Sequence, residues 1–283
     1  MRSWVELRLC RKARDTGMLA RFYRYFRWLS LDVTAGAIVL MIFFCQELDV
    51  PYHWPEYTIL GIVVWLIYTI DHLKDVSKLI APVSARRKFH VAHFRKLVYA
   101  GVVACLAAIL LVFLQSERIV LFGSLIGSIS GFYLFVSKRI DWFKEFWIAI
   151  TYAFGILLVP IARVGFVNTT ILLVVGLILM ALINLLLFSH FEVAEDEEEG
   201  FRSFASVMGS TMVNVTLAIC FSLLAFVIYG LWMAITSVYI AIFMSTTFLL
   251  YLGIWQIRWF RRKERYRIFG DAVLMLPLFF ILT

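Results

Sequence analysis

Two short stretches of this chain carry pairs of carboxylates spaced one helical turn apart. Asp71 and Asp75 belong to the first, WLIYTIDHLKDVSK, and Glu192 and Asp196 belong to the second, SHFEVAEDEEEGFR. Residues four apart share one face of an α-helix, so each pair presents two acids in the same direction. An isolated run of charge is usually a solvated helix face, so one pair alone does not establish a site.

The chemistry that suits these acids is magnesium binding. Mg²⁺ prefers oxygen ligands and is usually held by one or two carboxylates together with waters and substrate phosphates. We therefore expect Asp71, Asp75, Glu192 and Asp196 to bind Mg²⁺ when a diphosphate completes the coordination shell. The basic residues predicted to bind that diphosphate are Lys78, Arg86, Lys138 and Arg139. Taken singly, each could instead set the membrane orientation or contact lipid headgroups.

The composition places these acids in a membrane protein. Of the 283 residues, 63% are hydrophobic and only 16% are charged, whereas about a quarter are charged in soluble proteins. Hydropathy predicts nine transmembrane helices, at about 31–46, 54–71, 97–115, 119–137, 145–162, 169–190, 211–230, 233–255 and 268–282. The expected fold class is an all-α, polytopic membrane bundle.

The domain organisation follows from the same pattern. We expect one transmembrane domain over 31–283, preceded by a basic, amphipathic segment at 1–30 that lies on the cytoplasmic membrane surface. Met18 is an alternative start of the chain. No disulfide framework is predicted, because the four cysteines are scattered and form no CxxC pair.

The distribution of basic residues predicts the orientation. With the N-terminus in the cytoplasm, 25 of the 27 lysines and arginines fall inside, and only Arg118 and Arg163 are left outside. The net charge of +8 therefore reports topology, and no nucleic-acid partner is expected. The predicted location is a multi-pass position in a membrane, the inner membrane if the source is bacterial. Because 54–71 and 169–190 both run inward, both acidic pairs reach the cytoplasmic end of the bundle.

Aromatic residues are abundant, with 26 Phe, 12 Tyr and 9 Trp. Most are expected to face lipid or the core, and aromatic side chains are common at membrane interfaces. A subset that lines a cavity below the acids would suit an isoprenoid chain and could shield a carbocation with ring faces. The candidates are Tyr68, one turn before Asp71, and Tyr152.

In order and topology the chain resembles the UbiA superfamily of intramembrane prenyltransferases. That family has nine transmembrane helices, a motif NxxxDxxxD at the end of helix two, and DxxxD or DxxDxxxD followed by Gly and Thr or Ser at the end of helix six. The matching residues here are Asp71, Asp75, Glu192, Asp196, Gly200 and Ser203. The stretch YLFVSKRIDWFKEFWIAITYAFGILLVP also resembles the family's segment after helix four, where a basic pair precedes a helix rich in small residues.

The chain departs from the family motifs at three positions. Ile67 stands where the first motif has Asn, Ser189 stands where the fuller second motif has its first Asp, and Glu192 stands where the next Asp is usual. Glu195 offers an additional acid beside Asp196. These departures bear on the position of the metal and on the choice of substrate.

The resemblance implies an enzyme, a Mg²⁺-dependent prenyltransferase. It would move a prenyl group from an allylic prenyl diphosphate to an aromatic or otherwise lipid-soluble acceptor. One alternative is a UbiA-like membrane protein with a binding or scaffold role, which the absence of the Asn favours. Another is a cation-coupled transporter, for which only Asn184 and Asp271 are possible intramembrane polar sites. We expect Asp271 to pair with the adjacent Arg267.

Overall fold

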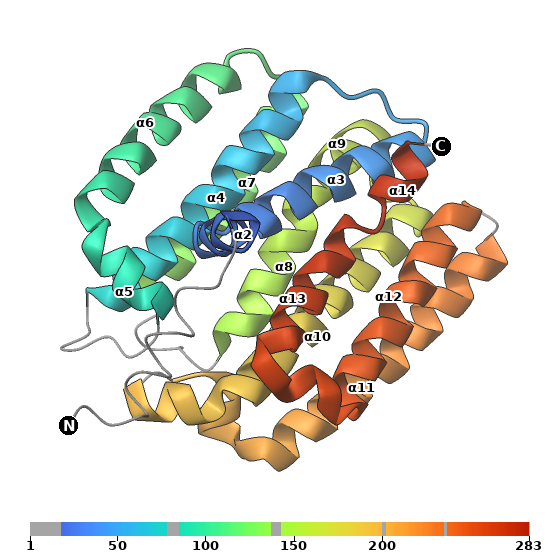
Figure 1. The fold of residues 1–283 in the computed structure, drawn as a ribbon. Helices are drawn as coiled ribbons and strands as arrows, with labels where there is room; N and C mark the ends of the chain where they lie inside the picture. The colour runs from blue at the N-terminus through green and yellow to red at the C-terminus, as the bar shows by residue number, and fades with distance from the viewer. Residues whose placement is uncertain (1–17, 78–84, 137–142, 200–201, 235–236, 283) are drawn as a thin grey trace, which may run out of the picture.

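The structure, a computed structural model, describes residues 18–77, 85–136, 143–199, 202–234 and 237–282. All regular elements in these ranges are helices, as Figure 1 shows, and the predicted all-α membrane bundle is confirmed. The helices are α2 (Met18–Trp28), α3 (Leu31–Glu47), α4 (Trp54–Val76), α5 (Ala85–Ala92), α6 (Phe94–Val112), α7 (Glu117–Val136), α8 (Lys144–Ile156), α9 (Leu158–Val164), α10 (Asn168–Glu199), α11 (Phe204–Ala234), α12 (Val238–Gln256), η2 (Arg258–Glu264), α13 (Arg265–Ala272), η3 (Val273–Met275) and α14 (Leu278–Ile281).

The long helix α10 is the centre of the bundle. It packs against α8, α11, α12 and α13 (Figure 1). Its apolar stretch buries Leu173, Leu177, Met180 and Ile183 almost completely. A helix satisfies its backbone hydrogen bonds internally, which is what the lipid environment requires of a spanning segment. The polar end of α10 then projects the second acidic pair beyond this core.

The described helices do not confirm the predicted number of nine spans. Within the described residues, four helices are long and apolar enough to cross a membrane, and the number rises to six if each of two bent helix pairs is one span. The remaining predicted spans coincide with α4, α7 and the C-terminal segment. The count of nine is therefore not confirmed, although the helical bundle is.

Two of the breaks between helices have a local cause. The helices α8 and α9 meet at 55°. Pro160 has no backbone N–H to donate to the carbonyl of Ile156, so a straight helix would lose a hydrogen bond at this point. The predicted span 268–282 is likewise interrupted, since it consists of α13, η3 and α14, and Pro277 lies just before α14.

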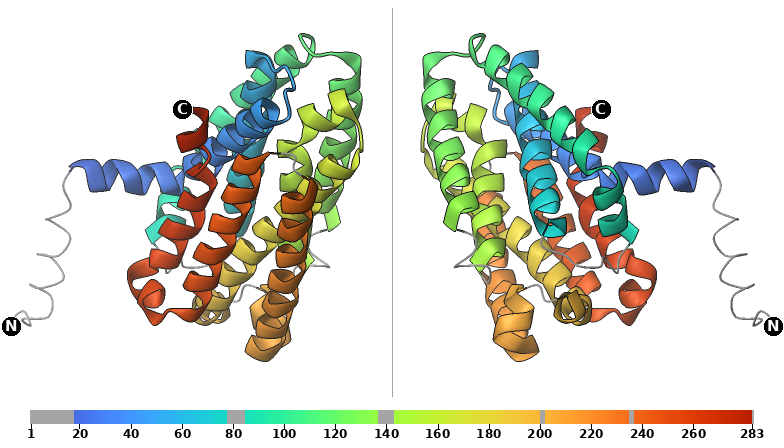
Figure 2. Two further views of the ribbon diagram at one scale, coloured as in Figure 1. Left: turned by 90° about the vertical axis from the view of Figure 1, so that its right-hand side faces the viewer. Right: turned by 90° about the vertical axis from the view of Figure 1, so that its left-hand side faces the viewer.

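The N-terminal helix α2 turns away from the bundle. It meets α3 at 73°, and Ser30 at the elbow adopts the left-handed conformation with φ of 54°. Figure 2 shows α2 projecting sideways from the body of the protein. One end of α2 stays attached, because Tyr25 and Trp28 pack on Phe89 of α5 with ring centroids 5.6 and 5.4 Å apart. This contact brings α2 to the end of the bundle where the acids lie.

Candidate functional site

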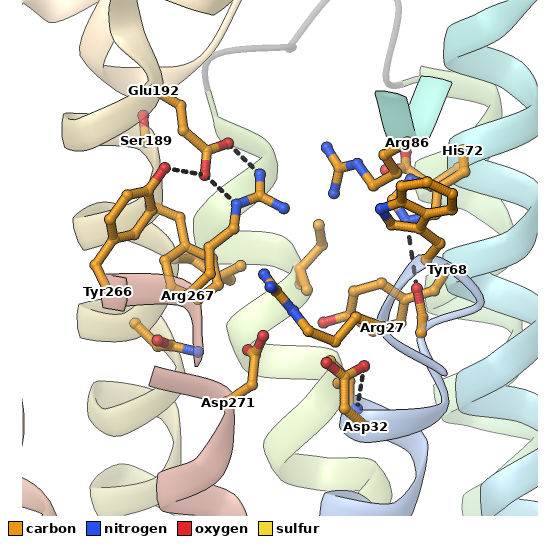
Figure 3. A pocket seen from close by; sticks show the side chains of 18 of the residues that line it. Arg27, Asp32, Tyr68, His72, Arg86, Ser189, Glu192, Tyr266, Arg267 and Asp271 are labelled. Carbon is orange, nitrogen blue, oxygen red and sulfur yellow. Dashed lines mark hydrogen bonds and ion pairs between the residues drawn. The ribbon is translucent and has the colours of Figure 1, made fainter. Parts of the chain in front are cut away.

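A cavity of about 520 Å³ opens at the end of the bundle where α4 and the apolar part of α10 end. Its size is typical of sites that bind small organic molecules. Side chains from α2, α3, α4, α5, α8, α10, α12 and α13 line it, so nearly the whole chain contributes to one chamber. Figure 3 shows part of this chamber from close by.

The structure brings the two acidic pairs together. Asp71 and Asp75 from α4 and Glu192 and Asp196 from α10 all line this cavity, although about 120 residues separate the pairs in the sequence. Both helices therefore end at the same end of the bundle, as the topology requires.

Three further predicted site residues also line the cavity, and three cannot be placed. Arg86, Tyr68 and Tyr152 are lining residues. The predicted diphosphate-binding residues Lys78, Lys138 and Arg139 lie outside the described residues. Seven of the ten predicted site residues therefore share one chamber.

Glu192 makes an ion pair with Arg267 of α13. Both of its carboxylate oxygens accept hydrogen bonds from the guanidinium, and the Tyr266 hydroxyl donates a third at 3.0 Å (Figure 3). Arg267 also interacts electrostatically with Asp271, its predicted partner, but its ion pair is with Glu192. For Glu192 to bind Mg²⁺ as predicted, its pair with Arg267 would have to open.

Asp196 lies in a different environment. The nearest atoms of Asp196 and Arg87 are 3.8 Å apart, and the Ser203 hydroxyl also hydrogen-bonds to Asp196. Burial raises the pKa of Asp196, while Ser203, Lys144 and Arg87 act in the opposite direction. Among the residues that the structure describes, Asp196 has no bidentate partner such as Glu192 has.

Basic side chains surround the acids. Burial lowers the pKa of Arg86 to about 10, and the Arg267 guanidinium acts in the same direction while Glu192 opposes both. Arg86 is therefore still a cation at neutral pH. Lys144 at the start of α8 interacts electrostatically with Asp71, Asp75 and Asp196. These two cations can bind phosphate oxygens beside the carboxylates.

A chain of contacts connects α5, the helix that carries Arg86, to the start of α3. The buried His90, one turn later on α5, bonds through Nδ1 to the Arg86 backbone carbonyl at 2.9 Å. The His90 ring lies 4.8 Å from that of His72, and His72 Nε2 is 3.3 Å from the Ser30 hydroxyl. The elbow between α2 and α3 is therefore connected to the helix that carries the arginine.

Two side chains fix the start of α11 over the site. The backbone N–H of Phe204 donates to Glu145 Oε1, and that of Ala205 donates to Ser189 Oγ, both at 3.0 Å. Ser189 thus serves as a helix cap at the position where the fuller family motif has an acid. Ile67 stands where the first family motif has Asn, and it is not among the residues that line the cavity.

The donor set suits magnesium only in part. Asp71, Asp75 and Asp196 offer the hard oxygens that Mg²⁺ prefers, whereas Glu192 is engaged by Arg267. Among the residues that the structure describes, no three His, Cys, Asp or Glu side chains lie close enough to hold an ion by themselves. Water and a diphosphate would have to supply the other ligands, which is how proteins commonly bind Mg²⁺.

Several lining residues were not selected from the sequence. They are Arg27, Asp32, Lys144, Tyr251 and Arg267. Their spacing contains no motif, because each comes from a different helix. The one available signal was position: Lys144 and Arg267 both lie at the predicted cytoplasmic ends of spans, at the same level as the acids.

Comparison with known proteins gives one family match and one match of fold. The model of the UbiA prenyltransferase family matches residues 90–282, which is more than half of the chain. The fold is similar to the apo structure of a UbiA homolog from Aeropyrum pernix K1, with a TM-score of 0.67 and 13% sequence identity over 90% of this chain and 99% of that chain. At this identity the likeness concerns the fold alone. No curated protein matches the sequence.

Proposed function

Since the chain belongs to the UbiA prenyltransferase family, we propose that it transfers a prenyl group from an allylic prenyl diphosphate to an aromatic, lipid-soluble acceptor. The observation that carries the proposal is that both acidic pairs and Arg86 line one chamber in this intramembrane prenyltransferase-type fold. Acids and cations at one end of an apolar bundle suit a substrate with a charged head and a hydrocarbon tail.

In this proposal Asp71, Asp75 and Asp196 hold Mg²⁺, and Arg86 and Lys144 bind phosphate oxygens. Bound Mg²⁺ would supply positive charge to the diphosphate as the bond between carbon and oxygen breaks. The arginine and lysine act on the same developing charge, and they are already oriented before the substrate arrives. The predicted roles of Lys78, Lys138 and Arg139 in diphosphate binding remain part of the proposal.

We assign Glu192 a positioning role in place of the predicted metal role. Its bidentate contact holds the Arg267 guanidinium beside the cavity. A glutamate reaches one methylene further than the usual aspartate, which suits contact with a side chain on a neighbouring helix. Arg267 is thereby fixed at the boundary between the charged and the deeper parts of the chamber.

Aromatic and aliphatic side chains would protect the prenyl cation. Tyr68 and Tyr152 line the cavity below the acids, together with Ile148 and Leu185. Ring faces attract a cation, and an apolar wall keeps out water that would quench it. The prenyl tail would lie along this wall.

The test is transfer by the purified protein. A labelled prenyl diphosphate, Mg²⁺ and a panel of aromatic acceptors should give a prenylated product, and EDTA should abolish it. Asp71→Asn should lower the rate on the order of a hundredfold or more. The matched control is Asp49→Asn, because Asp49 is exposed and lies just before α4 begins, at the end opposite Asp71. No turnover, with diphosphate binding unchanged in Asp71→Asn, would favour the binding or scaffold alternative.

A further inference from the structure

The deeper part of the chamber is polar, and prenyl transfer as described above makes no use of it. Asp32 of α3, Asn184 of α10, Tyr251 of α12 and Asp271 of α13 line it, and we call these four residues the polar floor. Asn184 precedes Glu192 by eight residues on α10, which is about 12 Å along the helix axis. The floor is therefore well separated from the acids at the mouth.

A close helix contact builds one side of the floor. A Cβ at Gly270 would lie 2.6 Å from Asn184 Oδ1 and 2.9 Å from Phe188 Cε1, so only glycine allows α13 to approach α10 this closely. The approach brings the next residue, Asp271, to Asn184, whose side-chain amide hydrogen-bonds to it. The fold thus places a carboxylate deep in the bundle and orients it.

The floor also contains polar atoms without partners. Tyr251 is fully buried and its hydroxyl has no hydrogen-bond partner among the described residues, and the same holds for Oδ1 of Asn184. Buried polar atoms nearly always have partners, since leaving them unpaired costs free energy. A prenyl tail could not satisfy them. A ligand with a polar end could.

The charged residues of the floor indicate which polar group such a ligand would carry. Figure 3 shows the carboxylates of Asp32 and Asp271 pointing into the same space beneath the Arg27 side chain. Both acids interact electrostatically with Arg27 and Arg267, but Arg267 is already paired with Glu192. A ligand carboxylate would be repelled by these two acids, which share the single cation Arg27. An uncharged hydroxyl can donate a hydrogen bond to either carboxylate without this repulsion.

We infer that the polar floor binds a hydroxyl group of an uncharged, phenol-type acceptor and selects against acceptors that present a carboxylate there. This inference rests on the proposed function, because it assigns the acceptor end of the same chamber. The donor diphosphate occupies the mouth, the prenyl tail lies on the apolar wall, and the acceptor hydroxyl reaches Asp271 and Tyr251. The position of the hydroxyl fixes which face of the ring meets the prenyl carbon.

The experiment is equilibrium binding of labelled resorcinol to the full chain in lipid nanodiscs, without donor. The competitor is 3-hydroxybenzoate, which replaces one hydroxyl by a carboxylate. The variants are Asp271→Asn and Tyr251→Phe, and the control is Tyr229→Phe, which removes a hydroxyl from an exposed tyrosine of α11. Binding of a labelled prenyl diphosphate with Mg²⁺ is measured in parallel on every variant.

We expect resorcinol to bind at least tenfold more tightly than 3-hydroxybenzoate. Asp271→Asn should weaken resorcinol about tenfold, as for loss of a hydrogen bond to a charged group, and Tyr251→Phe should weaken it severalfold. Tyr229→Phe should leave resorcinol binding unchanged, and donor binding should be unchanged in all three variants. Equal binding of 3-hydroxybenzoate, or unaltered resorcinol binding in both floor variants, would overturn the inference while leaving the proposed function intact. Absence of Mg²⁺-dependent donor binding in the unaltered protein would instead count against the proposed function.

Discussion

Replacing Glu192 by Gln should destabilise the protein without raising its requirement for magnesium. Glu192 and Arg267 form a bidentate ion pair in which the two side chains are only 14% and 19% exposed. Removing one partner of a buried pair leaves an uncompensated charge and costs about 3–5 kcal/mol. Because some exposure remains here, we expect a loss of about 3 kcal/mol in the free energy of unfolding. At about 2–4 °C per kcal/mol, the unfolding temperature should fall by about 6–12 °C.

The assay has two parts. Thermal unfolding of the purified protein is followed for Glu192→Gln, for Arg267→Gln and for the double variant, and the double variant should lose less stability than the sum of the single changes. The magnesium concentration that gives half-maximal prenyl transfer is measured for Glu192→Gln and for the unaltered protein, and we expect the two values to agree.

The opposite result would refute this reasoning. If Glu192→Gln unfolds at the original temperature and needs about tenfold more Mg²⁺, Glu192 is the metal ligand that the family motif predicts. The ion pair with Arg267 would then have to open when substrate binds. A measured coupling near zero between Glu192 and Arg267 would point to the same conclusion.

Three other predictions concern single side chains. Ser189→Ala should lower the free energy of unfolding by about 1 kcal/mol, because the start of α11 loses a cap; an unchanged unfolding temperature would contradict this assignment. Burial and the neighbouring Arg86 lower the pKa of His90, so the folded protein binds this proton less readily than the unfolded chain. Stability contributed by His90 should therefore be complete above the ordinary histidine pKa of about 6.5 and be lost as the pH falls toward the lowered value, and His90→Gln should flatten the dependence of unfolding temperature on pH over this range. Gly270→Ala should cost about 1–3 kcal/mol through overpacking against Asn184 and should weaken resorcinol binding more than donor binding; equal effects on both ligands would argue against a separate polar floor.

The sequence was sufficient to predict the fold class and the convergence of the acids. Long apolar stretches can form little other than helices in a membrane, and an even number of crossings between Asp75 and Glu192 puts both at one end. Hydropathy did not indicate the bend between α8 and α9 or the interruption of the C-terminal segment, because it measures composition and not the direction of the chain.

The partners of the charged residues could not be predicted. Arg267 lies four residues from Asp271 along the chain, yet its ion pair crosses to Glu192 on another helix. Such a choice depends on how α13 is rotated against α10, and that rotation depends on the close contact at Gly270. Spacing along one helix carries no information about the rotation of a neighbour. Asn184 and Asp271 were selected from the sequence only as possible transporter sites, and their grouping with Asp32 and Tyr251 was missed for the same reason, because each of the four comes from a different helix.

The short helix α2 has two faces with different surroundings. Arg27 and Trp28 belong to the wall of the chamber, whereas Met18 and Phe22 are 86% and 68% exposed on a helix that leaves the bundle at 73°. An amphipathic helix of this kind settles at the boundary between headgroups and acyl chains. We therefore expect α2 to lie at this boundary, where a change in bilayer thickness or surface charge would move Arg27 and with it one wall of the cavity.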